Sequence, residues 1–204
     1  MKYMFILFAT LLFSFVALAD PPYDSYQVRY ANLNVGDSYV NLGNSGANGS
    51  VDPTDNICAN VYVFDSAQEL ISCCACPLSP MHLKTFSVKN DLVSNTLTPG
   101  IPTAVTVAIV ATSMKGAAPT TCNASNAYAQ PTNLVSGLGA WMTTPHVLTG
   151  VATPYLTETP FLQSTLSTPM LNKMTSYCGF IQANGSGFGI CKPCRQGAQG
   201  PAQM

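Results

Sequence analysis

The sequence predicts a mainly β (α+β) fold: an antiparallel β-sandwich-like domain with a C-terminal helix, stabilised by disulfides. Three observations support this prediction. Short runs of alternating apolar and polar residues follow one another between clusters of turn residues. A dependable helical spacing of apolar residues occurs once, late in the chain. Finally, the 204 residues contain eight cysteines, an even number that is typical of a disulfide framework in an oxidising compartment.

The first 19 residues have the pattern of a secretory signal peptide. Lys2 gives a positive start, residues 3–16 form a mostly apolar run, and Ala17-Leu18-Ala19 is a small-x-small cleavage site. A membrane anchor needs about 20 apolar residues, whereas this run is shorter and is followed by Asp20-Pro21-Pro22. We expect cleavage after Ala19, a secreted or periplasmic protein, and no membrane span in the mature chain.

Length and composition predict one domain that binds neither nucleic acid nor anionic lipid. We expect residues 20–194 to form a single β-rich domain and residues 195–204 to form a flexible tail. Charged residues make up only 8% of the chain, and the formal net charge is −1. Nucleic acid and anionic membranes both require a concentrated positive patch. The 47% apolar content also argues against intrinsic disorder.

The predicted strands begin directly after the signal peptide and its short linker. Ile57 to Phe64 is the clearest strand, because it is rich in β-branched and aromatic residues. Residues 43–56 collect turn-forming residues and predict a loop. Alternation of Val105, Val107 and Ile109 with smaller residues predicts one buried face. The complete set of expected strands is 26–33, 38–42, 57–64, 69–74, 85–88 and 102–112.

The pattern changes after Met114, where helices are expected. Residues 132–141 predict a short helix, although they contain two glycines. Thr159-Pro160 and Thr168-Pro169 each combine a helix N-cap residue with proline at the first helical position. The second pair predicts a helix over about residues 169–184, which ends at Asn184-Gly185. Its buried face is expected to contain Met170, Leu171, Met174, Tyr177, Cys178 and Ile181.

The cysteines are the main candidate site residues, and we expect them to form up to four disulfides. Eight cysteines allow 105 pairings, so the sequence alone does not determine which ones bond. If residues 65–68 form the hairpin turn, Cys58 lies opposite Ala75 or, with a turn one residue longer, opposite Cys76. This register leads to the hypothesis of a bond from Cys58 to Cys74 or Cys76. The predicted set is Cys58, Cys73, Cys74, Cys76, Cys122, Cys178, Cys191 and Cys194.

A second pairing hypothesis concerns the C-terminus. Cys178, on the predicted helix, lies close in sequence to Cys191 and Cys194. A bond from Cys178 to either of them would fix the C-terminal segment against the helix.

The two CxxC pairs, Cys73 with Cys76 and Cys191 with Cys194, allow other interpretations. Four thiolates could hold zinc, but the pairs are far apart in sequence and the compartment is oxidising. Haem attachment needs a histidine after the second cysteine, where Pro77 and Arg195 stand instead. A redox pair is favoured at a helix N-terminus, and the residues after Cys194 do not predict a helix. We therefore expect disulfides, and no metal or cofactor.

No pattern identifies a catalytic site. The two histidines, His82 and His146, occur in proline-flanked stretches that predict exposed loops, and the chain lacks a G-x-S-x-G motif. Glu158 is expected to cap or solvate a helix start. The alternating aromatics of residues 23–30 are expected in the core rather than on a ligand-binding face. Trp141 is the single tryptophan.

Three segments resemble a set of uncharacterised, exported, cysteine-rich bacterial proteins. They are "NICANVYVFDSAQELISCCACPLSP", "NDLVSNTLTP" and "YCGFIQANGSGFGICKPC". The resemblance extends from about Tyr26 to Cys194 and implies a bacterial secreted protein. It implies no activity, ligand or catalytic residue.

These observations predict a structural or binding protein of the cell surface, periplasm or extracellular matrix, with other surface or matrix proteins or polysaccharide as partners. The alternative is a secreted hydrolase that acts on polysaccharide or peptide, with His146 or Glu158 in a cleft. A cleft that joins His146 to an acid and a nucleophile would favour the enzyme. A flat aromatic strip or an open strand edge would favour binding or assembly, including donation of the tail "DPPYDSY" as a strand.

Overall fold

The computed structural model describes residues 23–34, 36–47, 54–114, 122–125, 131–146, 150 and 155–195. The predicted signal peptide, most of the predicted C-terminal tail and residues 48–53 of the predicted loop lie outside this part of the chain. All structural statements below concern the described residues.

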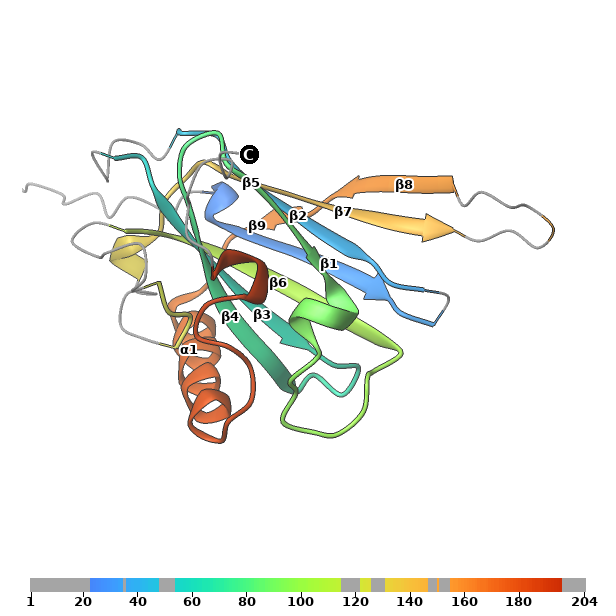
Figure 1. The fold of residues 1–204 in the computed structure, drawn as a ribbon. Helices are drawn as coiled ribbons and strands as arrows, with labels where there is room; N and C mark the ends of the chain where they lie inside the picture. Colours follow the sequence, from blue (N-terminus) through green and yellow to red (C-terminus); the bar gives the residue numbers. More distant parts are fainter. Residues whose placement is uncertain are drawn as a thin grey trace, which may run out of the picture.

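Two antiparallel sheets pack against each other, and one α-helix lies on the outer face of the first sheet (Figure 1). This arrangement confirms the predicted β-sandwich-like fold with a C-terminal helix. Sheet A contains, in spatial order, β4 (Leu70–Leu78), β3 (Ile57–Phe64), β6 (Ala104–Ser113), β1 (Tyr26–Asn32) and β9 (Leu162–Ser164). Sheet B contains β5 (Leu83–Ser87), β2 (Tyr39–Asn44), β7 (Leu138–His146) and β8 (Tyr155–Pro160). The helix is α1 (Thr168–Ala183).

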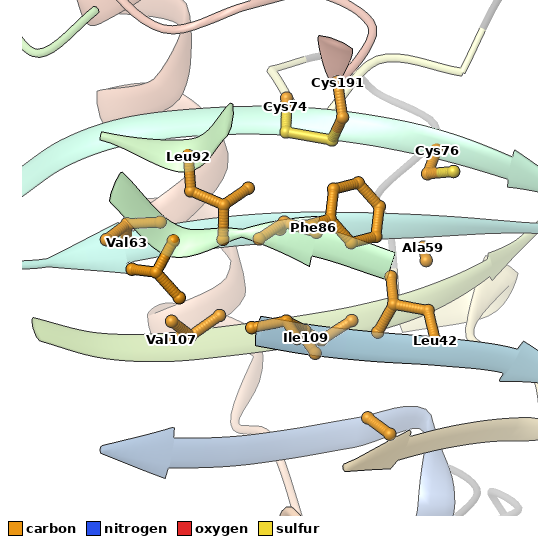
Figure 2. Close-up of a cluster of buried hydrophobic side chains, with 14 of the residues drawn as sticks. Leu42, Ala59, Val63, Cys74, Cys76, Phe86, Leu92, Val107, Ile109 and Cys191 are labelled. Atoms are coloured by element: carbon orange, nitrogen blue, oxygen red, sulfur yellow. A yellow bond between two sulfur atoms is a disulfide. The ribbon is translucent and has the colours of Figure 1, made fainter. Parts of the chain in front are cut away.

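The main core lies between the two sheets. Figure 2 shows Leu42 and Phe86 from sheet B among Val63, Val107 and Ile109 from sheet A. All five side chains are buried. Complete burial of an aliphatic or aromatic side chain stabilises a fold by about 1.5–3 kcal/mol, so this layer holds the two sheets together.

A second core lies between sheet A and α1. Strands β3, β4 and β6 are therefore buried on both faces, unlike the single buried face that the alternation in β6 predicted. On β3, Val61 faces sheet B, whereas Cys58 and Tyr62 face the helix layer. The hydroxyl of Tyr62 donates a hydrogen bond of 2.8 Å to the carbonyl oxygen of Ala124. Burial raises the pKa of Tyr62 far above its ordinary value.

Helix α1 follows the predicted range closely, with one difference at its start. The N-cap is Ser167 rather than Thr168, and its Oγ accepts a hydrogen bond from the backbone N–H of Met170. Leu171, Met174, Cys178 and Ile181 form the buried face. Tyr177 was also predicted there, but it is 49% exposed.

Two of the helix predictions are wrong, because most of the residues concerned lie in strands of sheet B. Residues 131–133 form one 3-10 turn, and β7 follows in place of the predicted helix over 132–141. Leu138, Ala140 and Met142 are buried on alternate positions, which is the period of a strand. Thr159-Pro160 ends β8 instead of starting a helix. Pro160 is tolerated because β8 is an edge strand.

The chain passes from sheet B to sheet A at the corner between β8 and β9. Phe161, between the two strands, is buried, and its N–H donates to the carbonyl oxygen of Ala140 at 2.9 Å. Beside this corner the Gln27 side chain on β1 donates 2.7 Å to the carbonyl oxygen of Leu138 on β7. The two sheets are therefore joined by hydrogen bonds as well as by the core.

Strand β1 pairs with β6 and β9 within the same chain. This pairing, together with a 3-10 turn at Tyr23–Ser25, argues against the hypothesis that the N-terminal tail is a donated strand. Within the described residues, no helix has both the length and the apolar character needed to span a membrane.

Candidate functional site

The eight cysteines form four disulfides, which agrees with the predicted disulfide-stabilised fold. The bonds are Cys58–Cys122, Cys73–Cys178, Cys74–Cys191 and Cys76–Cys194, with Cα–Cα distances of 5.7, 5.8, 4.9 and 5.4 Å. Figure 2 shows the bond between Cys74 and Cys191 beside the inter-sheet core. Each cysteine of the two CxxC pairs bonds to a partner outside its own pair.

The hypothesis that Cys58 bonds to Cys74 or Cys76 is wrong. A register shift at Val63/Phe64 places Cys58 opposite Pro77. More importantly, Cys58 points to the helix layer, whereas Cys74 and Cys76 point to the inter-sheet core. Side chains on opposite faces of one sheet cannot form a disulfide without moving the backbone.

The hypothesis that Cys178 bonds to Cys191 or Cys194 is also wrong. The C-terminal segment, residues 188–194, leaves the helix and runs beside the outer edge of β4 in parallel orientation. Its backbone makes three hydrogen bonds of 2.8–3.0 Å with Cys73 and Ala75. Cys191 and Cys194 therefore reach the inter-sheet side of β4, while Cys178 on α1 reaches Cys73 on the opposite side.

The two residues proposed for a hydrolase do not form a catalytic pair. His146 pairs with Tyr155 across β7 and β8, and Glu158 pairs with Thr143, so their side chains point to opposite faces of sheet B. His146 stacks on the Tyr155 ring at 4.6 Å and its Nε2 lies 2.8 Å from Thr157 Oγ1. His146 thus belongs to a strand rather than to the predicted loop.

His82 is far from this pair in the fold, in the turn between β4 and β5. Its Nδ1 lies 3.4 Å from the hydroxyl of Ser79. Partial burial, with a smaller contribution from the nearby Lys84, lowers the pKa of His82 below its ordinary value. Among the described residues, no group of three or more His, Cys, Asp or Glu side chains is placed to hold a metal ion.

A concave groove of about 360 Å³ lies between α1 and the outer face of sheet A. Val28, Phe64, Met170 and Met174 supply apolar lining. Asp65 also borders the groove, but its Oδ1 accepts the backbone N–H groups of residues 67 and 69 in the hairpin turn. That carboxylate stabilises the turn, and Gln68 and Lys173 add polar groups beside the apolar lining.

The outer face of sheet B carries a different arrangement, in which a row of polar side chains crosses all four strands. We call Thr85, Asn41, Thr143 and Glu158 the polar row. Thr85 Oγ1 donates to Asn41 Oδ1 at 2.7 Å, and Asn41 Nδ2 donates to Thr143 Oγ1 at 2.9 Å. Thr143 Oγ1 in turn donates to Glu158 Oε1 at 3.3 Å. This chain of hydrogen bonds fixes the orientation of each side chain.

Two aromatic residues flank the polar row on the same face. Trp141 lies opposite Asn41, and Tyr39 lies opposite Thr143. Trp141 lies beside Gly43 of the neighbouring strand, where its Cζ3 is 3.8 Å from the position that a Cβ on Gly43 would occupy. The absence of a side chain at Gly43 leaves room for the indole. Tyr39 is 39% exposed.

Tyr30, one of the alternating aromatics in residues 23–30, was expected in the core, but it is 58% exposed on the outer face of sheet A. The sequence signal that could have identified the sheet B surface is a strand that combines glycines with an aromatic residue, because an aromatic ring in a sheet can cover a glycine of the neighbouring strand. That signal depends on knowing that residues 138–146 form a strand.

The comparisons with known proteins show no family. No protein-family model matches the chain, and the search of curated proteins finds no match. Among solved structures, the chain is similar to "Crystal Structure of Thermotoga maritima 1070", at 8% sequence identity and a TM-score of 0.43. The similarity covers 70% of this chain and 97% of that chain. At this identity and TM-score, it carries no inference about function.

The fold itself defines the class of this chain: a disulfide-rich antiparallel β-sandwich protein. Four disulfides indicate an oxidising environment outside the cytoplasm.

Proposed function

We propose that the protein is exported, loses residues 1–19, and acts without catalysis as a binding component of the cell surface, periplasm or extracellular matrix. We further propose that the outer face of sheet B binds a neutral polysaccharide. The observation that carries this proposal is the position of Trp141, which packs beside Gly43 and next to the polar row.

The chemistry of this face is suited to sugar rings. A pyranose has an apolar C–H face, which packs on an aromatic ring, and a rim of hydroxyl groups, which both donate and accept hydrogen bonds. Asparagine and threonine offer donors and acceptors together. Because four strands lie side by side about 4.8 Å apart, the face is extended rather than concave, which suits a linear chain.

The charge of this face favours a neutral polymer. Glu158 is the one ionised side chain among the strand residues that point outward from sheet B. A single carboxylate would repel an acidic polysaccharide, and no strand residue on this face is basic. The separation of His146 and Glu158 onto opposite faces of the sheet favours binding over the hydrolase alternative.

Binding to insoluble neutral polysaccharides tests the proposed surface. The wild-type protein, Trp141→Ala and Phe180→Ala are mixed with cellulose, chitin and an insoluble β-glucan, and the free protein is measured after centrifugation. Aromatic rings stacked on one another contribute about 0.5–1.5 kcal/mol. If a sugar on the indole contributes a similar amount, Trp141→Ala is expected to weaken binding by up to about tenfold. Phe180 on α1 is 61% exposed but lies on the other side of the molecule, so its replacement should leave binding unchanged.

Equal losses for the two variants, or no retention of the wild type by any of the polymers, would contradict the proposed surface. Export is tested separately by cell fractionation and by the intact mass of the protein after thiol alkylation. We expect the mass of residues 20–204, with all eight thiols reacting only after reduction. Cytoplasmic protein with reactive thiols would contradict the proposed location.

A further inference from the structure

Strand β8 forms an open edge of sheet B. In Figure 1, β7 and β8 extend together away from α1, and β8 is the outer strand. Among the described residues, no strand pairs with the outer side of β8. The corresponding edge of sheet A, on β4, is covered by the C-terminal segment, and β9 at its other edge has only three residues. An exposed edge of six residues can accept another strand.

The register shows which backbone groups of β8 are free to do so. The N–H of Phe161 donates to Ala140, which makes these two residues a hydrogen-bonded pair. Hydrogen-bonded and non-hydrogen-bonded pairs alternate in an antiparallel ladder. Thr159, Thr157 and Tyr155 therefore bond to β7, and the N–H and C=O groups of Leu156 and Glu158 point away from it. Pro145 and Pro160 both occupy non-bonded pairs, which agrees with this assignment.

We propose that β8 pairs antiparallel with β8 of a second copy of this chain, with the two-fold axis at Thr157. This register places Leu156 opposite Glu158 of the other copy, and Glu158 opposite its Leu156. Both positions have outward N–H and C=O groups, so each of the two pairs makes two N–H···O bonds. Thr157 lies opposite its own copy, a cross-strand pair that is favourable in sheets.

The neighbouring symmetric registers are less favourable. An axis at Glu158 would place two carboxylates opposite each other, which is destabilising, and would pair Leu156 with Pro160, which has no N–H. An axis at Leu156 would pair Glu158 with Pro154, which also lacks an N–H. A two-fold contact is self-complementary by symmetry, so the chain itself supplies a partner with matching groups.

The pairing would extend sheet B into one continuous sheet of eight strands. Leu156, which is 62% exposed in the single chain, would then be covered in part by the other copy. This proposal does not depend on polysaccharide binding, and each of the two can fail without the other.

Charge variants at Leu156 test both the edge and the register. Protein purified in its oxidised, exported form is studied by sedimentation equilibrium over a range of micromolar concentrations. We expect a wild-type dimer. Leu156→Glu should raise the dimer dissociation constant about tenfold, because it places like charges opposite each other twice. Leu156→Lys should lower it about fivefold at low salt, and this gain should disappear at high salt.

Leu156→Thr is the matched control, because it keeps the backbone donor and adds no charge; it should stay within about twofold of the wild type. Amide exchange provides an independent measurement, in which protection of Leu156 and Glu158 should rise with protein concentration. A wild type that remains monomeric at millimolar concentration overturns the proposal. Equal weakening by Leu156→Glu and Leu156→Lys overturns the two-fold register.

Discussion

The β3–β4 region and the β7–β8 hairpin of this molecule are stabilised in different ways. Every disulfide joins β3 or β4 to another segment: a loop at Cys122, helix α1, or the C-terminal segment. The hairpin has no cysteine, and backbone pairing and the polar row hold it in place. Disulfides thus stabilise the region in which segments distant in sequence pack against β3 and β4. The surface that we assign to recognition is held by non-covalent contacts alone.

Removal of a disulfide from the β3–β4 region should lower the free energy of unfolding much more than removal of a hydrogen bond from the hairpin. This is the largest difference that we expect between the two regions. In Cys58→Ala/Cys122→Ala, a bond that closes a loop of 64 residues is lost, and none of the other three bonds shortens this loop. The chain-entropy model gives about 4–5 kcal/mol for such a loop. Thr143→Val in the polar row is expected to cost about 1 kcal/mol, because it breaks exposed or half-buried hydrogen bonds. Guanidinium unfolding of both variants checks this order, and similar midpoints would contradict it.

A smaller difference in stability is expected when one glycine in each region is replaced by alanine. Gly187 has a φ of +64°, and a Cβ there would lie 2.9 Å from the carbonyl oxygen of Cys73. Gly187→Ala should therefore destabilise the fold by about 2 kcal/mol or more, through both strain and a backbone clash. Gly139→Ala on β7 is the matched control, since its Cβ would have its nearest neighbour at 3.9 Å. It should cost less than about 1 kcal/mol. Thermal unfolding of the two variants provides the measurement.

The smallest expected effect is a change in the pH dependence of stability. It concerns His82, in the turn between β4 of sheet A and β5 of sheet B. The pKa of His82 is lowered in the folded protein by partial burial and by Lys84. The folded state therefore resists protonation of this imidazole more than the unfolded state does. Its contribution to stability is present above about pH 6.5 and is lost as the pH falls below that value. His82→Gln should slightly flatten the decline in melting temperature between neutral and mildly acidic pH. An unchanged pH profile would contradict this assignment.

The sequence predicted the elements whose patterns are local. β3 coincides with the predicted residues 57–64, because it combines β-branched residues with clear turn signals at both ends. Helix α1 was predicted to within about one residue, since its cap, its proline and its apolar spacing agree. β7 was missed because its glycines and its Trp141 do not give a strong strand pattern. These residues of β7 pair with strand β2, which is distant in sequence, and this pairing stabilises the strand.

The disulfide partners and the candidate surface could not be predicted for a related reason. Whether Cys58 can reach Cys74 depends on which face of β3 meets the second sheet, and on a register shift at Val63/Phe64. Likewise, the exposure of Trp141 depends on which face of sheet B is left uncovered. Both are properties of the assembled layers, and an alternating pattern alone does not say which face is which.

The course of the C-terminal segment has a consequence for the order in which this protein matures. Three of the four disulfides join β4 to cysteines at positions 178, 191 and 194. Cys73, Cys74 and Cys76 are synthesised 105, 117 and 118 residues before their native partners, so they remain without these partners during that interval. During this interval Cys58 is the nearest preceding thiol, and bonds formed with it must later be exchanged. We therefore expect native pairing to be faster with a thiol–disulfide isomerase, or in an environment that delays oxidation until these partners have been synthesised.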